Sequence, residues 1–379
     1  MHQLQPFFTP MPDFTIKIYK QLLEALKDTG YRFFTFEEYM RRTEDGRQKT
    51  EVRAPFTILR HDVDLLPQNS LAFARIQHEM GIRGSYYFRA VPESWDEDII
   101  KEIHNLGHEV GYHYEDVDLV KLEAGSWKSE GREAQEMVGG GKGESLKEKG
   151  EKQSWKLEAG SRKEEGLSSK VRDDSKETDN SHETRASSLD PSASSFELQA
   201  SSFSLLDAAI LSFQNNLEKL RQLVPVKTIC MHGSPRSKYD NRDLWKKYDY
   251  RDFGIIGEPY FDMDFDDVFY LTDTGRRWDG WKVSVRDKVP QQERWIEEGL
   301  VFGSTGEIIE RVRNLERWKL VARSSKVEES GSKVFPSRVM FTFHPQRWTD
   351  RPVPWLKELV AQNVKNMVKG VMVRWRKER

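Results

Sequence analysis

Short apolar runs of strand length recur along the chain, and each is bounded by polar residues, Gly or Pro. Runs that are rich in β-branched and aromatic residues are typical of strands buried on both faces of a parallel sheet. The pattern therefore predicts seven buried strands. They are 56–64 (FTILRHDVD), 84–90 (GSYYFRA), 108–114 (HEVGYHY), 227–233 (KTICMHG), 254–260 (GIIGEPY), 268–273 (VFYLTD) and 339–345 (VMFTFHP).

Helical periodicity fills several of the intervals between these strands. Residues 70–81 and 96–108 place apolar side chains at helical spacing and stop at Gly81 and Gly107, and 205–223 predicts a longer amphipathic helix. Strands that alternate with helices form βαβ units. Seven strands buried on both faces fit a barrel better than a half-exposed sheet. The predicted fold class is therefore an α/β barrel.

Two segments outside this pattern define the domain organisation. Residues 14–40 predict a helix, a short strand and a second helix before the barrel begins. Residues 121–200 contain no Ile or Tyr and one Phe, but 14 Lys or Arg, 17 Asp or Glu, 14 Ser and 9 Gly. Such a segment cannot bury enough apolar surface to offset its ordering entropy, so we expect it to be a disordered insertion. The expected parts are an N-terminal helical extension packed on the barrel (1–54), a barrel (55–120 and 201–379) and the insertion (121–200).

Composition excludes several classes of protein. The 379 residues include 60 Lys or Arg and 62 Asp or Glu, a net charge of −2, which argues against a basic nucleic-acid-binding protein. The single cysteine, Cys230, excludes a disulfide framework. No apolar run reaches the length of a membrane span and no signal peptide is evident, so we expect a soluble cytoplasmic protein.

Histidines and aspartates gather where several predicted strands end. The first strand ends in the sequence His-Asp-Val-Asp, which contains Asp62 and Asp64. The third ends at His113, the fourth at His232 and the last at His344. In α/β barrels and parallel sheets the carboxyl ends of the strands share one rim, where active sites lie. We therefore expect these residues to be close in space.

The spacing of Asp62 and Asp64 puts both carboxylates on one side of an extended strand, about 6–7 Å apart at Cα. Like charges repel there unless they share a positive charge, and a divalent metal is the simplest one. One Asp can bind the ion while the other accepts a proton from water. His113 offers an imidazole ligand, and mixed carboxylate and imidazole ligands suit zinc or a similar metal. The alternative is that the Asp pair caps the following helix.

The remaining candidate site residues each have more than one possible role. His232, beside Gly233, can complete the metal shell, contact substrate or only bond a loop. His344 can act as a general acid near neutral pH. Trp348 and Tyr114 are candidate substrate contacts because aromatic faces stack on sugar rings, and packing in the core is the alternative for both.

Other catalytic motifs are absent from the sequence. There is no G-x-G-x-x-G, Walker A or G-x-S-x-G pattern, so dinucleotide binding, NTP binding and serine hydrolysis have no support. Cys230 lies within a predicted strand, which favours a buried thiol over a nucleophile.

Three motifs resemble those of the polysaccharide deacetylases, the NodB-homology domain or carbohydrate esterase family 4. ILRHDVD resembles the first motif, whose leading Asp is the base and whose following Asp binds metal. GHEVGYHYED resembles the second, whose His is a ligand, and VMFTFHP resembles the last, whose His is the acid. The resemblance covers roughly 55–120 and 205–350, and it implies a distorted (β/α)7 barrel.

This chain departs from the family pattern at three places. A Val separates the two aspartates, which makes an Asp-x-Asp variant, and Val117 stands where the family has a second His. We rank His232 first as the replacement ligand. The other two candidates are Glu115 and Asp116. Arg236 is the approximate counterpart of the Arg in the family's third motif, and it is a candidate substrate-binding residue.

The resemblance implies a metal-dependent deacetylase that acts on an N-acetylated sugar or glycan precursor. One divalent ion is implied, with zinc first and cobalt, nickel or manganese as alternatives. Its ligands would be Asp64, His113 and His232, with Asp62 as the base and His344 as the acid. Two alternatives remain: a hydrolase of another non-peptide C–N bond, and a catalytically inactive sugar-binding protein, for which Val117 is the main support.

Overall fold

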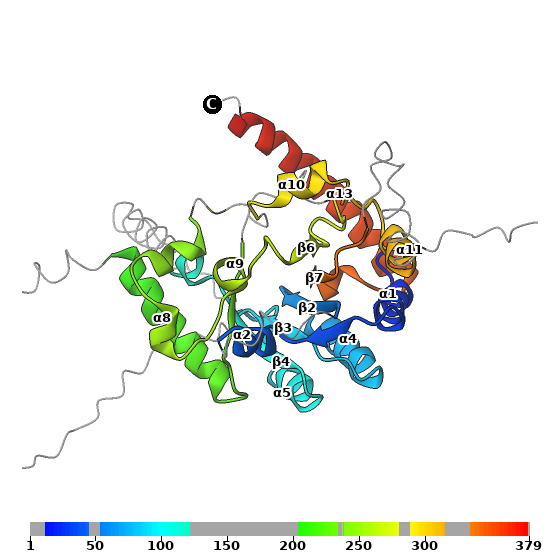
Figure 1. Cartoon of the computed structure of the whole chain (residues 1–379). Coiled ribbons are helices and arrows are strands. Elements are labelled where there is room, and N and C mark those ends of the chain that lie inside the picture. Colours follow the sequence, from blue (N-terminus) through cyan, green and yellow to red (C-terminus); the bar gives the residue numbers. More distant parts are fainter. Residues whose placement is uncertain are drawn as a thin grey trace, which may run out of the picture. The chain divides into compact units, whose positions relative to one another are not determined.

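The computed structural model describes residues 12–44, 54–121, 204–233, 237, 239–279, 289–314 and 334–377. Contacts group the chain into one unit of Met1–Ala124 with Ser204–Arg379 and a second unit of Gly125–Phe203. All described residues belong to the first unit (Figure 1). Apart from Lys121, the predicted insertion lies outside the described residues, so its disorder stays a prediction.

Seven parallel strands form one sheet in the described part of the chain. The order along the sheet is β5-β4-β3-β2-β7-β6, and β1 pairs with the first half of β2. Nearly every strand residue is buried, as expected for parallel strands covered on both faces. The strands are β1 (Arg32–Phe34), β2 (Phe56–Val63), β3 (Ser85–Phe88), β4 (Glu109–Tyr114), β5 (Ile229–Met231), β6 (Phe269–Thr272) and β7 (Arg338–Phe343).

One of the seven expected runs, 254–260, does not form a strand, and this prediction was wrong. Only Gly257 makes an isolated parallel bridge, to Thr228, and the short helix α9 (Pro259–Asp262) follows at once. Pro259 has no N–H to give to a sheet and suits the first position of a helix. The Glu258 side chain accepts a hydrogen bond from the Tyr260 N–H and caps that helix. The strand count still reaches seven because β1, from the N-terminal segment, joins the sheet.

The sheet curls into part of a barrel. Its first long strand, β2, pairs with its last, β7, so that His61 lies opposite Phe343. A barrel built in chain order requires this neighbour relation between first and last strands. Within the described ranges no strand pairing joins β5 to β6, so the structure shows a curled parallel sheet with helices around the outside of the arc (Figure 1).

The expected helices form, and their ends follow the local sequence. The predicted helices at 70–81, 96–108 and 205–223 correspond to α4, α5 and α8. Ser204 and Asp207 form a capping box at the start of α8. The helices are α1 (Ile16–Asp28), α2 (Phe36–Glu44), α4 (Pro67–Glu79), α5 (Glu97–Asn105), α8 (Leu205–Arg221), α9, α10 (Gln292–Glu297), α11 (Thr305–Arg313) and α13 (Pro352–Lys377).

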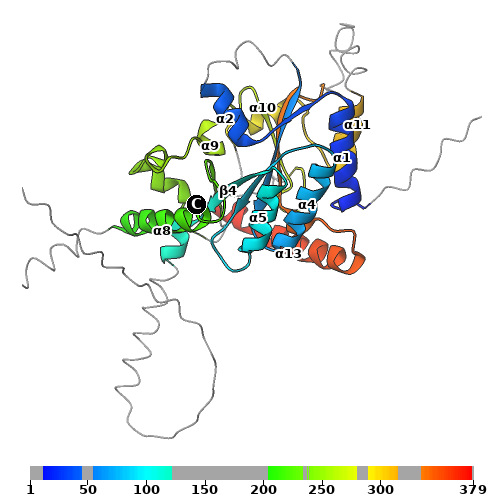
Figure 2. The same ribbon diagram turned by 90° about the horizontal axis from the view of Figure 1, so that it is seen from below.

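The N-terminal segment is built into this unit. It forms α1, β1 and α2 in the order that the sequence predicts, and α1 packs beside α11 (Figures 1 and 2). Tyr19 of α1 stacks on Phe73 of α4 and meets the edges of Phe343 and Trp348. This aromatic cluster supports the chain where β7 ends, next to His344. None of the helices in the described ranges combines the length and apolar character needed to cross a bilayer.

Candidate metal centre

The structure brings together the four side chains that the sequence placed at the strand ends. Asp64 follows β2, His113 lies in β4, His232 follows β5 and His344 follows β7. The Oδ1 atom of Asp64 lies 3.6 Å from Nε2 of His113 and 3.6 Å from Nε2 of His232. Its Oδ2 atom lies 3.8 Å from Nε2 of His344. The carboxyl ends of four parallel strands thus meet at one carboxylate.

Asp64, His113 and His232 fit a divalent metal. Their ligand atoms all lie within 4.8 Å of one another. Atoms bound at about 2.0–2.1 Å to a tetrahedral zinc ion lie roughly 3.3 Å apart, close to the spacing here. The distances of 3.6 Å are too long for hydrogen bonds, and the buried Oδ1 of Asp64 has no hydrogen-bond partner among the described residues. A buried carboxylate oxygen facing two imidazole nitrogens suits a cation between them.

Both imidazole rings are held so that Nε2 faces Asp64. The Nδ1–H of His113 donates to the backbone oxygen of Cys230 at 2.9 Å. The Nδ1 of His232 lies 2.9 Å from Oε2 of Glu115 and donates to it. A proton on Nδ1 leaves the lone pair of Nε2 for a metal, which is the usual arrangement around histidine ligands.

Glu115 supports the site from behind His232. Arg89 donates to both of its carboxylate oxygens, at 2.7 and 2.9 Å, and also to the backbone oxygen of Asp64 at 3.0 Å. Burial raises the pKa of Glu115, but its bond to His232 and the charge of Arg89 outweigh this and lower the pKa overall. Burial alone would lower the pKa of His232, yet Glu115 and Asp64 raise it. Glu115, one of the alternative ligands, therefore orients His232 here.

Asp62 lies beside this cluster as a second carboxylate. Its Oδ2 is 3.9 Å from Nε2 of His113. Arg60 donates to both of its oxygens, at 2.8 and 2.7 Å. Burial opposes ionisation of Asp62, but the Arg60 guanidinium outweighs it and lowers the pKa to about 2. Asp62 is therefore ionised at neutral pH.

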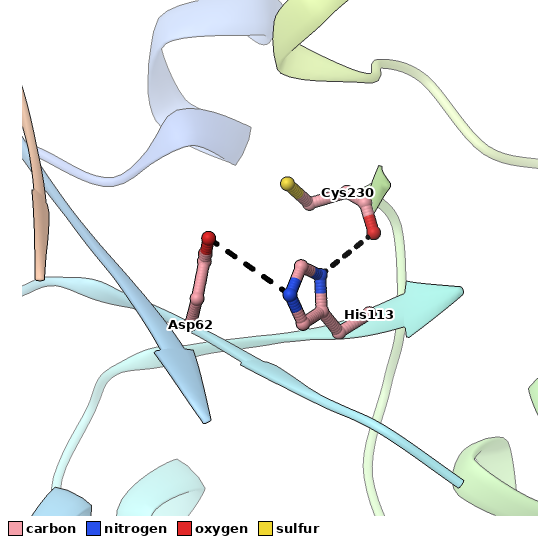
Figure 3. Close-up of side chains that lie close together, drawn as sticks. All are labelled: Asp62, His113 and Cys230. Carbon is pink, nitrogen blue, oxygen red and sulfur yellow. Dashed lines mark hydrogen bonds and ion pairs between the residues drawn. The ribbon is translucent and has the colours of Figure 1, made fainter. Parts of the chain in front are cut away.

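Asp62, His113 and Cys230 form a second group of possible ligands (Figure 3). This group is less suited to an ion than the first. Both oxygens of Asp62 are engaged by Arg60, and Nδ1 of His113 is engaged by the Cys230 carbonyl. Cys230 is buried in β5, as the sequence predicts.

His344 faces Asp64 from the carboxyl end of the neighbouring strand, β7. Its Nδ1–H donates to Oδ1 of Asp273 at 2.5 Å, and its backbone N–H donates to Oδ2 at 2.9 Å. Asp273 also accepts from Arg347 at 3.0 Å and from the Trp348 indole at 2.6 Å. These contacts fix the ring with Nε2 toward the cluster.

Sequence reasoning missed five supporting residues: Arg60, Arg89, Asp273, Gln346 and Arg347. Gln346 donates to Oδ2 of Asp64 at 3.0 Å. Asp273 ends the predicted strand 268–273, so its position at the rim was visible in the sequence. Arg60 lies two residues before Asp62 in the same strand, so the spacing that puts Asp62 and Asp64 on one side also puts Arg60 there.

The predicted substrate contacts are not supported by the structure. Trp348 is 1% exposed, and its indole nitrogen is used by Asp273. Tyr114 is fully buried, with its ring against Phe213 and Trp245. Both aromatic rings pack in the core, because alternate positions of a strand point away from the rim cluster and the turn after β7 folds inward. Arg236 lies outside the described residues.

Comparison with models of protein families, with curated proteins and with solved structures gives no match for this chain. The fold and the site therefore define its class by themselves: an α/β protein with a candidate metal centre at the carboxyl ends of its parallel strands.

Proposed function

We propose that this protein is a metal-dependent hydrolase that removes the acetyl group from an N-acetylated sugar or glycan precursor. The observation that carries the proposal is the convergence of Asp64, His113 and His232, flanked by Asp62 and by His344. The motif resemblance to the polysaccharide deacetylases supplies the substrate class. The pairing of β2 with β7 is consistent with the distorted (β/α)7 barrel that this resemblance implies.

Asp64, His113 and His232 would hold one divalent ion, with zinc first and cobalt, nickel or manganese as alternatives. When bound, such an ion supplies a Lewis acid for the acetyl carbonyl and lowers the pKa of water. The donor set of one carboxylate and two imidazoles is the kind that zinc binds in catalytic sites.

The two flanking residues divide the proton transfers between them. Asp62, kept ionised by Arg60, accepts the proton that water loses as it attacks the acetyl carbon. His344 donates a proton from Nε2 to the nitrogen that leaves the sugar amide. Asp273 accepts a hydrogen bond from Nδ1 of His344 and so stabilises the charged ring that donates.

The test combines metal analysis of the purified full chain with acetate release from oligomers of N-acetylglucosamine. We expect about one equivalent of a divalent metal, lost in Asp64→Ala and His113→Ala, and weakened roughly 10–100-fold in His232→Ala. Asp62→Asn should keep the metal and lose turnover by roughly 10²–10⁴-fold, and His344→Ala should also keep the metal. Asp98→Asn and His78→Ala, both exposed, are the matched controls.

Two outcomes would overturn the proposal. A chain that holds no metal and releases no acetate is not this enzyme. A chain that binds the oligomers equally well with and without Asp62 and His344, and releases no acetate in either form, is a sugar-binding protein.

A further inference from the structure

The long helix α13 presents its apolar side chains to solvent. Five of them are 55–71% exposed, and their spacing of three or four residues places them in one stripe along the helix. They are Val353, Leu356, Val360, Val364 and Met367. Exposed apolar side chains that form a continuous stripe mark a surface of interaction. We call these five residues the apolar stripe.

The side of α13 that faces the rest of the unit carries buried polar side chains beside the half-buried Trp355 and Leu359. Gln362 and Asn366 are buried, and Nδ2 of Asn366 donates to the backbone oxygen of Gly275 at 2.8 Å. Arg276 donates to the backbone oxygen of Trp355 at 2.7 Å, and its guanidinium lies 4.4 Å from the centre of the Trp355 ring. A surface helix ordinarily buries its apolar side and exposes its polar side. Here Gln362 and Asn366 are buried while five apolar side chains are exposed, so the apolar stripe is left open by the described part of this unit.

The charge of α13 selects among the possible partners. Its sequence has six basic residues and one acidic residue, a net charge of +5 in a chain whose net charge is −2. The basic residues are Lys357, Lys365, Lys369, Arg374, Arg376 and Lys377, and the acidic one is Glu358. A second copy of α13 on the stripe would bring like charges together, which is unfavourable. An anionic surface would instead attract the helix.

We propose that α13 binds the surface of an anionic lipid bilayer, with the apolar stripe inserted at the interface and the exposed Lys357 and Lys365 against the headgroups. An amphipathic helix that is rich in Lys and Arg and carries exposed Val, Leu and Met is the kind that lies in this plane. Its 26 residues give it a length of about 39 Å, enough for several turns to engage the surface at once. The proposal is independent of the proposed function.

The experiment measures how the full chain sediments with vesicles of phosphatidylcholine alone or with about 30% phosphatidylserine, at low and at physiological salt. We expect binding to the anionic vesicles that is at least tenfold tighter than to the neutral ones and that weakens with salt. Val360→Asp combined with Val364→Asp should lower binding at least tenfold. Lys357→Glu combined with Lys365→Glu should lower binding to the anionic vesicles roughly tenfold or more. The control is Leu211→Asp, which changes an exposed leucine on α8 and should bind as the wild type does.

Circular dichroism will show that the variants fold, since all the changed side chains are exposed. A wild-type chain that stays in solution with both vesicles would overturn the proposal, because the stripe would then be covered by another segment or protein. A dimer in solution that Val360→Asp with Val364→Asp converts to a monomer would also overturn it, in favour of a second copy. Equal binding to neutral and anionic vesicles would refute the role of charge.

Discussion

At the scale of single residues, Asp273 decides whether His344 can serve as an acid. It accepts four hydrogen bonds, from His344 Nδ1 and N, the Trp348 indole and Arg347. Asp273→Asn keeps the size of the side chain but removes its charge and gives it an N–H group that one of these donors must face. We expect turnover to fall by roughly 10²–10⁴-fold, as expected when the partner that orients a catalytic His loses its charge. Steady-state acetate release measures this effect.

The control for this change is the metal content, which should stay the same because Asp273 bonds His344 rather than the three proposed ligands. If His344 has no part in proton transfer, the variant will turn over like the wild type once its stability is matched by temperature. That outcome would remove His344 from the proposed chemistry.

The single residues of the site also show which of its features could be predicted from the sequence. Asp64, His113 and His232 were predicted as neighbours because each lies at the carboxyl end of a strand, and parallel strands bring those ends together. Asp273 was within reach of the same argument. The bond from Arg60 to Asp62 was also within reach, because residues two apart on a strand point to the same side. Trp348 and Tyr114 were misassigned because aromatic residues near a rim in sequence can equally fill the core.

At the scale of elements, a single buried carboxylate joins β4 to α8. Asp116, just after β4, accepts hydrogen bonds from Tyr112 at 2.8 Å, from Ser212 at 2.7 Å and from Asn216 at 2.8 Å. Burial raises the pKa of Asp116 to about 6, although these hydrogen bonds oppose the shift. We therefore expect the contribution of Asp116 to the packing of α8 on the sheet to depend on pH.

We expect this group to lower stability as the pH rises. Between about pH 4 and 6 the folded chain holds a proton on Asp116 that the unfolded chain has released, so the free energy of unfolding falls as pH increases. This contribution is fully present below pH 4 and is lost as pH rises through 6. Asp116→Asn does not titrate, so relative to wild type it should gain up to about 3 kcal/mol between pH 4 and 7.5. Urea unfolding at a series of pH values measures the difference.

Asp98→Asn, on the exposed side of α5, is the control. Its free energy of unfolding should change with pH as that of the wild type does. A constant difference between Asp116→Asn and wild type at every pH would show that Asp116 is ionised throughout this range in the folded chain.

The elements themselves were largely predictable, and the exception has a local cause. Buried apolar runs and helical periodicity predicted all seven strands and the helices α1, α2, α4, α5 and α8. The run 254–260 has the same apolar character, yet Pro259 and the cap from Glu258 turn the chain into α9. A count of apolar residues cannot predict this turn, because it takes no account of the backbone N–H that Pro259 lacks.

At the scale of the whole molecule, the candidate metal centre is assembled from two distant blocks of sequence. Asp64 and His113 come from the block before the segment 125–203, and His232 and His344 come from the block after it. Both blocks belong to one compact unit, and their strands pair directly, β4 with β5 and β2 with β7. The described residues of the centre therefore all lie outside 125–203.

The last prediction follows from this division. Replacing residues 125–203 with a Gly/Ser linker of about 12 residues, which spans roughly 18–20 Å, should preserve the fold, the metal content and the activity. Closing a loop of 79 residues costs more entropy than closing one of about 12, so the shortened chain should be more stable by roughly 1–2 kcal/mol. Urea unfolding, metal analysis and acetate release test these expectations separately.

The control is a chain of full length in which the sequence of residues 125–203 is shuffled. It keeps the length of the loop, so its stability, metal content and activity should match those of the wild type. Loss of soluble protein on shortening would mean that the segment packs on the rest of the chain. Loss of metal with the fold intact would mean that it supplies part of the centre.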